Sequence, residues 1–164
     1  MGYLHCHMCL KAAEDLKAGV SWVFTNLPQA ETKVDECPKL CSEARDGFDT
    51  WKRFSFRERT DYLRKMRHLI AANIDQLIEI ICTDTGKVPV EAITADLLTV
   101  VDYIKHVEKT GVKTLRPKKV STPIALFGRK SYIEYQPRGV VLVISPWNYP
   151  FQLSLIPLIA AAFA

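Results

Sequence analysis

The most informative run in the sequence is GVVLVISPWNYP, at residues 139–150. Its first half, residues 140–144, is apolar without alternation, which is typical of a strand buried on both faces of a parallel sheet. Residues 145–150 contain two prolines and are predicted to form a stiff loop. Apolar residues then recur at helical spacing in residues 151–163. The sequence therefore predicts the first strand–loop–helix unit of a doubly wound α/β domain over residues 140–164.

Two long amphipathic helices are predicted before this unit. Ser55 and Glu58 form a capping box at the start of the first helix, because each side chain can satisfy a free backbone amide of the first turn. Gly86 is expected to end that helix as a left-handed cap. Pro89 suits the first turn of the second helix, and Gly111 is expected to close it. The apolar stripes comprise Tyr62, Met66, Leu69, Ile70, Ile74, Leu77, Ile78 and Ile81 in the first helix and Ile93, Leu97, Val100, Val101, Ile104 and Val107 in the second. Together they predict a helical hairpin that packs on another part of the chain.

A short helix and a β-hairpin arm complete the predicted elements. Residues 42–51 repeat apolar side chains at intervals of three and four, which predicts a short helix. Residues 115–123 are basic and flanked by proline, and they are predicted to form a connector. Residues 124–127 and 131–136 are predicted to form two short strands around a Gly-Arg-Lys turn, which is a hairpin signal. The arm is expected to cover residues 118–137.

The size and charge of the chain limit the classes of protein to which it can belong. The chain has 164 residues, 48% of them hydrophobic, which is enough for one domain with a core. Its net charge is +4, and the lysines and arginines are spread through helical stretches, which favours a solvated surface over nucleic-acid binding. No secretory signal is recognised in residues 1–17, so the expected compartment is the cytoplasm, where the five cysteines would be reduced.

Residues 140–164 contain no charged side chain, which raises the possibility of a membrane span. Three prolines interrupt the run, and Asn148 and Gln152 add polar side chains to it. A buried strand–loop–helix unit accommodates all of these residues. The sequence therefore favours that unit over a membrane-anchored helix.

The N-terminal region carries little pattern, and residues 1–36 are expected to form a poorly ordered extension. Cys6 and Cys9 are spaced as C-x-x-C, and Cys37 and Cys41 as C-x-x-x-C, so four thiolates could in principle hold zinc. The second spacing is loose, which favours incidental cysteines, and no metal site is predicted. Cys82 lies on an apolar helix face and is predicted to be a buried structural thiol.

Residues 139–150 closely resemble the Pro-Trp-Asn segment of the aldehyde dehydrogenase superfamily. Further segments that resemble this family, most of all its class 3, fatty-aldehyde-type branch, lie at residues 44–48, 84–87, 118–123 and 130–133. The resemblance covers roughly residues 40–164. It implies an α/β fold for residues 37–164, in which the helical hairpin and the β-hairpin arm lead into the first strand–loop–helix unit of an incomplete Rossmann-like domain.

The resemblance also implies a function, namely oxidation of an aldehyde to a carboxylic acid with NAD or NADP. In this family a cysteine thiolate attacks the carbonyl group, a hydride passes to the nicotinamide, and water cleaves the thioester. The family's oxyanion donor matches Asn148, and the stretch that lines its cofactor cleft matches Ile144, Ser145, Pro146 and Trp147. From the residues alone, a loop that merely packs is favoured, and it is the resemblance that assigns these roles. Aliphatic aldehydes of medium to long chain are the expected substrates, and the arm is expected to support a homo-oligomer of the full-length enzyme.

The family's nucleophilic cysteine and its glutamate base match nothing in this sequence. The chain ends within an apolar helix, so we expect a segment or truncated product of a longer enzyme, with no activity of its own. An alternative is a non-catalytic interaction or subunit module that retains the family's N-terminal part.

Overall fold

The computed structural model describes residues 33–164, so nearly all of the predicted N-terminal extension, with Cys6 and Cys9, lies outside the described residues. The α-helices are α2 (Cys37–Trp51), α3 (Phe56–Ala72), α4 (Ile74–Thr85), α5 (Pro89–Glu91), α6 (Leu98–Leu115) and α7 (Pro150–Phe163), and the strands are β1 (Lys118–Val120) and β2 (Ser131–Ile133). A π-helical segment, η3 (Ala92–Leu97), precedes α6, and 3-10 turns occur at η2 (Val34–Glu36) and η4 (Ile124–Leu126). This part of the chain is mostly helical, with one small antiparallel sheet.

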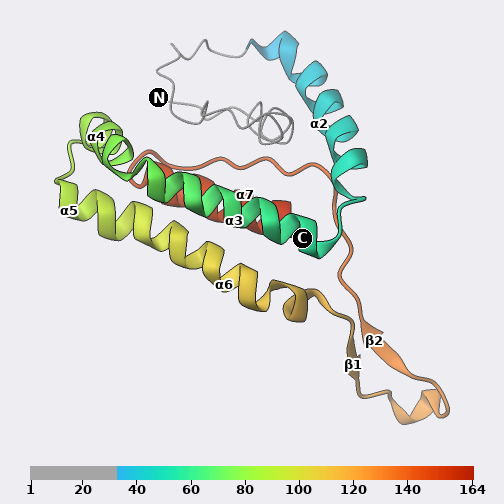
Figure 1. Cartoon of the computed structure of the whole chain (residues 1–164). Helices are drawn as coiled ribbons and strands as arrows, with labels where there is room; N and C mark the ends of the chain where they lie inside the picture. The colour runs from blue at the N-terminus through green and yellow to red at the C-terminus, as the bar shows by residue number, and fades with distance from the viewer. Residues whose placement is uncertain (1–32) are drawn as a thin grey trace.

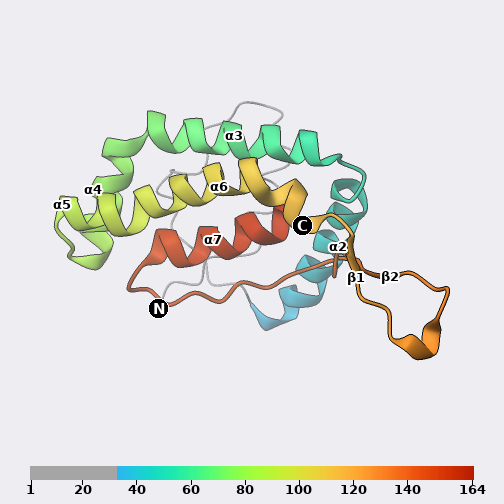
Figure 2. The same ribbon diagram turned by 90° about the horizontal axis from the view of Figure 1, so that it is seen from below.

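Helices α3, α6 and α7 lie alongside one another, and each contacts the other two (Figures 1 and 2). Helix α4 joins α3 to the start of α6 at one end of this group. Helix α2 and the two-stranded arm lie at the other end, and the arm projects away from the helices (Figure 1). The predicted helical hairpin is therefore present, and the part of the chain on which it packs is α7.

The core lies between these helices. Its buried apolar side chains are Leu63, Ile70, Leu77, Ile81, Ala92, Leu97, Val100, Ile104, Val107, Leu155, Ile159 and Phe163. Most of the members from α3, α4 and α6 belong to the predicted stripes. Because burying one such side chain contributes about 1.5–3 kcal/mol, this cluster is the main favourable contribution to the stability of the fold.

Local signals at three helix ends are confirmed. The Ser55 hydroxyl accepts a hydrogen bond from the Glu58 amide at 3.3 Å, and the Glu58 carboxylate accepts one from the Ser55 amide at 2.8 Å. Gly86 ends α4 with a left-handed φ of 73°. Pro89 occupies the first position of α5. Each of these signals acts within a single turn, so the sequence displays it directly.

Two expectations about helix length are wrong. The first long helix is in fact two helices, because Asn73, with φ −115° and ψ 25°, interrupts it. The Asn73 side-chain amide donates to the Leu69 carbonyl at 2.8 Å, the kind of local competition with the helical ladder that favours a break. Gly111 does not close the second helix, since α6 continues to Leu115. Gly111 is instead buried where α6 meets α7.

The arm pairs differently from the prediction. Strand β2 is antiparallel to β1, with Val120 opposite Ser131, so the first strand lies within the predicted connector. The segment predicted as the first strand is the 3-10 turn η4, in which Ile124 is 94% exposed. The Thr122 hydroxyl accepts a hydrogen bond from the Ser131 amide at 3.2 Å, which closes the loop between the strands. This side-chain contact favours the longer loop over the expected tight turn.

The strand predicted at residues 140–144 is also not formed, and these residues run alongside the helices without regular structure. Leu142 and Ile144 are 71% and 80% exposed. A buried strand needs a neighbouring strand for its backbone hydrogen bonds, and in the described part of the chain no strand lies beside it. Only the loop and the helix of the predicted strand–loop–helix unit are therefore seen.

A membrane-spanning helix is not among the described elements: none of the helices within residues 33–164 is both long enough and apolar enough to cross a bilayer.

Candidate functional site

The candidate site is the loop at residues 145–149, which leads into the N-terminus of α7. It lies at the end of the molecule where α4 and α5 meet (Figures 1 and 2). Asn148 is exposed in a turn with Trp147, and among the described residues no group is hydrogen-bonded to its side chain. Within residues 33–164, nothing therefore competes with a bound molecule for the hydrogen bonds of the Asn148 amide.

The residues predicted to line a cofactor cleft differ in their exposure. Ile144 and Trp147 are 80% and 74% exposed, and Pro146 is exposed as well. Ser145 is half-buried, and its hydroxyl is hydrogen-bonded at 2.7 Å to the hydroxyl of Ser154 in α7. Three of the predicted residues thus offer apolar surface beside Asn148, while Ser145 ties the start of the loop to α7.

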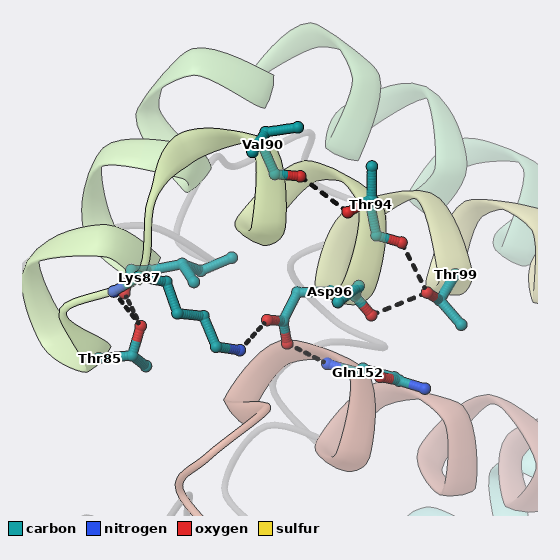
Figure 3. A network of polar contacts seen from close by, with 9 residues as sticks. Thr85, Lys87, Val90, Thr94, Asp96, Thr99 and Gln152 are labelled. Carbon is teal, nitrogen blue, oxygen red and sulfur yellow. Dashed lines mark hydrogen bonds and ion pairs between the residues drawn. The ribbon is translucent and has the colours of Figure 1, made fainter.

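The end of the loop is held by a polar network that the sequence analysis missed (Figure 3). Lys87 Nζ donates to Asp96 Oδ2 at 2.7 Å and lies 3.7 Å from the centre of the Tyr149 ring. Asp96 Oδ1 accepts a hydrogen bond from the backbone amide of Gln152 at 3.2 Å. The network therefore joins the turn after α4, the π-helical segment and the first turn of α7.

Both charges of this network are buried. The Asp96 side chain is fully buried, and that of Lys87 is 9% exposed. In the sequence, Asp96 stands one residue before Leu97, at the edge of the apolar stripe, where a charged residue is easily taken for part of the solvated face. A carboxylate at the border of a buried face is costly unless it is paired, and this position was the signal that could have revealed it.

The π-helical segment is what carries Asp96. The Thr94 hydroxyl donates to the Val90 carbonyl at 2.8 Å, and the Thr99 hydroxyl donates to the carbonyls of Ala95 and Thr94 at 2.8 and 3.2 Å (Figure 3). Hydroxyl groups bonded to the preceding turn bend helices, and π-helical turns are frequent at functional sites. The irregular turn thus places a carboxylate inside the molecule.

A dinucleotide fits part of this surface. The exposed side chains of Ile144, Pro146 and Trp147 can contact a flat ring. The N-terminus of α7 offers few amides to a phosphate: Pro150 has no N–H, the amide of Gln152 already donates to the Asp96 carboxylate, and only that of Phe151 is left in the first three residues. The phosphates would therefore need donors in addition to this helix.

The cysteines show no arrangement for chemistry within the described part of the chain. Cys37 and Cys41 are exposed on α2, and Cys82 is half-buried against the core. Across residues 33–164, three or more His, Cys, Asp or Glu side chains nowhere gather as a set of metal ligands.

Comparison with known proteins relates the chain to one protein family. A model described as "Aldehyde dehydrogenase family" matches residues 11–164. The chain is 40% identical over 115 residues to the 4,4'-diapolycopene aldehyde oxidase of Methylomonas sp, a match that covers 70% of this chain and 22% of that protein. It is also 40% identical over 113 residues to the 4,4'-diaponeurosporen-aldehyde dehydrogenase of Staphylococcus aureus, covering 69% of this chain and 24% of the relative.

Aldehyde dehydrogenase family 3 member H1 of Arabidopsis thaliana is 31% identical over 129 residues, which is 79% of this chain and 27% of that protein. Among solved structures, the substrate-bound state of Staphylococcus aureus AldH matches with a TM-score of 0.69 and 33% identity, over 80% of this chain and 28% of that one. The chain thus spans about a quarter of the length of the curated relatives that it matches.

Proposed function

This chain belongs to the aldehyde dehydrogenase family, and we propose that it supplies the N-terminal part of an enzyme that oxidises an aldehyde to a carboxylic acid with NAD or NADP. Its relatives are oxidoreductases that act on aldehydes. The proposal assigns one catalytic contributor to these residues, Asn148. The nucleophile and the general base would come from another part of the enzyme.

The observation that carries the proposal is the position of Asn148, which exposes its amide on a loop held at both ends. Attack of a thiolate on an aldehyde carbonyl places negative charge on the carbonyl oxygen. The Asn148 amide donates a hydrogen bond to that oxygen, and losing one such donor costs about 2.7–4 kcal/mol of transition-state stabilisation. When bound, NAD or NADP supplies the acceptor for the hydride, and Ile144, Pro146 and Trp147 form an apolar wall beside it.

We propose that the substrate is an aliphatic aldehyde of medium to long chain. We also propose that the enzyme belongs to the class 3 branch of the family. The similarity to a family 3 member supports the branch. The two relatives at 40% identity, whose names specify a 4,4'-diapolycopene and a 4,4'-diaponeurosporen aldehyde, support a substrate larger than a short-chain aldehyde. We place the enzyme in the cytoplasm.

The arm supports a homo-oligomer of the complete enzyme. Ile124 and Phe127 at its tip are both 94% exposed. Exposed apolar side chains grouped on a projecting segment are typical of a surface that another protein covers.

The exposed apolar tip of the arm also supports a second candidate function, a non-catalytic subunit that joins an intact dehydrogenase. Co-purification of this chain with an intact dehydrogenase, in the absence of activity of its own, would favour that second candidate.

The activity is tested in a chimaera, in which this chain replaces the matching 28% of Staphylococcus aureus AldH. We expect reduction of NAD or NADP with a long-chain aldehyde, and we expect Asn148→Ala to lower kcat about 100- to 1000-fold with little change in the KM for the cofactor. Gln136→Ala, which removes an exposed amide from the arm, is the matched control and should leave kcat unchanged. An unaltered kcat in the Asn148 variant would refute the assignment.

The chain on its own, residues 1–164, provides the second part of the test. We expect no reduction of NAD or NADP by this chain with any aldehyde, because no residue is assigned as nucleophile. Reduced cofactor that forms with the purified chain would contradict this expectation.

A further inference from the structure

We propose that the buried ion pair of Lys87 and Asp96 is a positioning device for Asn148, an inference that rests on the proposed role of Asn148 as oxyanion donor. Neither residue touches the reacting atoms in this proposal. Both act by holding the loop that carries Asn148 in one place relative to the rest of the molecule.

The first contact is between Asp96 and α7. Its Oδ1 atom accepts from the amide of Gln152, the third residue of the helix, while Oδ2 accepts from Lys87. One carboxylate therefore binds two donors that are far apart in the sequence. Because Asp96 is fully buried, water does not compete for either hydrogen bond. The carboxylate fixes where α7 begins, and Asn148 lies two residues before that helix.

The second contact is between Lys87 and the loop itself. The ammonium group lies 3.7 Å from the centre of the Tyr149 ring, well within the range of a cation–π contact. Tyr149 directly follows Asn148. The same cation that neutralises Asp96 therefore holds the neighbour of the proposed oxyanion donor.

The third contact closes the other end of the loop. The hydrogen bond of 2.7 Å between Ser145 and Ser154 ties the first loop residue to α7. The three residues between these anchors are Pro146, Trp147 and Asn148, and the proline limits their backbone freedom further. The amide of Asn148 is thus exposed on a segment with little room to move.

Stability alone does not account for this network. A buried ion pair usually adds little over an apolar pair of the same shape, because desolvation of the charges offsets their attraction. Two irregular backbone segments also position the pair. The left-handed turn at Gly86 directly precedes Lys87, and the π-helical segment carries Asp96. Compared with an apolar pair, the ion pair adds the directional hydrogen bonds of the carboxylate, which fix the relative positions of the groups that it joins.

The rate of the reaction depends on how accurately the Asn148 amide is placed against the substrate oxygen. A misplacement of about 1 Å can lower a rate about 100-fold. Replacing the pair by Lys87→Met and Asp96→Val changes the side-chain volumes little and removes both charges together, so no unpaired charge is left in the core. In the chimaera we expect this double variant to lower kcat about 10- to 100-fold, with the KM for cofactor and for aldehyde changed less than about threefold.

A double-mutant cycle separates positioning from a general structural effect. If the pair acts through Asn148, the double variant should cause little further loss of kcat when Asn148→Ala is already present. An equal loss in both backgrounds would overturn the proposal. Lys105→Ala with Asp102→Ala, which removes an exposed ion pair of α6 at 3.4 Å, is the matched control and should leave kcat unchanged.

Hydrogen exchange on the 164-residue chain tests the anchoring without any activity. We expect the amide of Gln152 and those of residues 147–149 to exchange faster in the double variant, while amides of α3 keep their protection. Unchanged exchange at these positions would overturn the inference, whatever the chimaera shows. An inactive unsubstituted chimaera together with faster loop exchange in the double variant would instead count against the proposed function and leave the anchoring supported.

Discussion

Phe163 in α7 lies so close to Gly111 in α6 that a Cβ atom added at position 111 would overlap the Phe163 ring, at Cε1 first of all. Phe163 is buried, with 3% of its surface exposed. The absence of a side chain at Gly111 therefore sets how near the two helices approach, near the end of α7 that lies away from the Asn148 loop.

Gly111→Ala should destabilise the chain. Alanine is favoured over glycine in a helix by about 1 kcal/mol, but forcing a methyl group into a filled core costs about 1–3 kcal/mol. We expect a net loss of about 1 kcal/mol in the free energy of unfolding, measured by urea denaturation. In the background of Phe163→Leu, which opens space for the methyl group, the same change should be neutral or stabilising. A loss of equal size in both backgrounds would show that the ring is not the cause.

Arg59→Met should also lower stability, because Arg59 caps the C-terminal end of α7. Its guanidinium donates to the Phe163 carbonyl at 3.0 Å from a buried position. Leaving such a carbonyl without its donor costs about 1–3 kcal/mol. Arg57→Met is the matched control, because Arg57 is exposed on α3, the helix that also carries Arg59. The thermal midpoint of this control should stay near that of the unsubstituted chain. Equal midpoints for the two variants would contradict this account.

Gly86→Ala tests the turn that precedes Lys87. Gly86 has a φ of 73°, and no atom lies within 4 Å of a Cβ placed there, so any effect comes from the backbone alone. A left-handed conformation costs alanine about 1–2 kcal/mol, and thermal unfolding should show a loss of this size. Asparagine tolerates this conformation better, so Gly86→Asn should lose less. If the asparagine variant were the less stable of the two, strain at this φ would not explain the effect.

The capping box of α3 predicts a dependence of stability on pH. The hydroxyl and amide of Ser55 donate to Glu58 and lower the pKa of its carboxyl group below the ordinary value of 4.5. The ionised carboxylate therefore stabilises the folded state above pH 4.5, and this contribution is lost as the pH falls through the lowered pKa. The difference in thermal midpoint between the unsubstituted chain and Glu58→Gln should shrink between pH 5 and pH 3, roughly the range in which a carboxyl group of lowered pKa titrates.

Glu79→Gln removes a charge from an exposed position of α4 and controls for the change in net charge in this experiment. A difference for Glu58→Gln that stayed constant across the acid range would argue against the capping carboxylate.

Much of the helical architecture could be predicted from the sequence because its signals are local. The Ser55–Glu58 box, the left-handed Gly86 and Pro89 each act within one helical turn, and the apolar stripes repeat with the helical period. The Pro-Trp-Asn loop could be recognised for a similar reason, since its residue types are contiguous. Asn73 shows the limit of such signals, because a side chain that can break a helix does so only where the packing of the two parts allows it.

Other features depend on segments that meet only in the folded chain. The register of β1 against β2 depends on the contact of Thr122 with Ser131, and residues 140–144 have a strand-like sequence but no adjacent strand among the described residues. Asp96 stands at the edge of an apolar stripe in the sequence, and its two donors lie nine residues before it and 56 residues after it. Residue types and periodicity are thus sufficient for helices and their caps, because those interactions span a few residues. The anchoring of Asn148 required the tertiary fold, because a buried carboxylate is stable only where packing brings its distant donors to it.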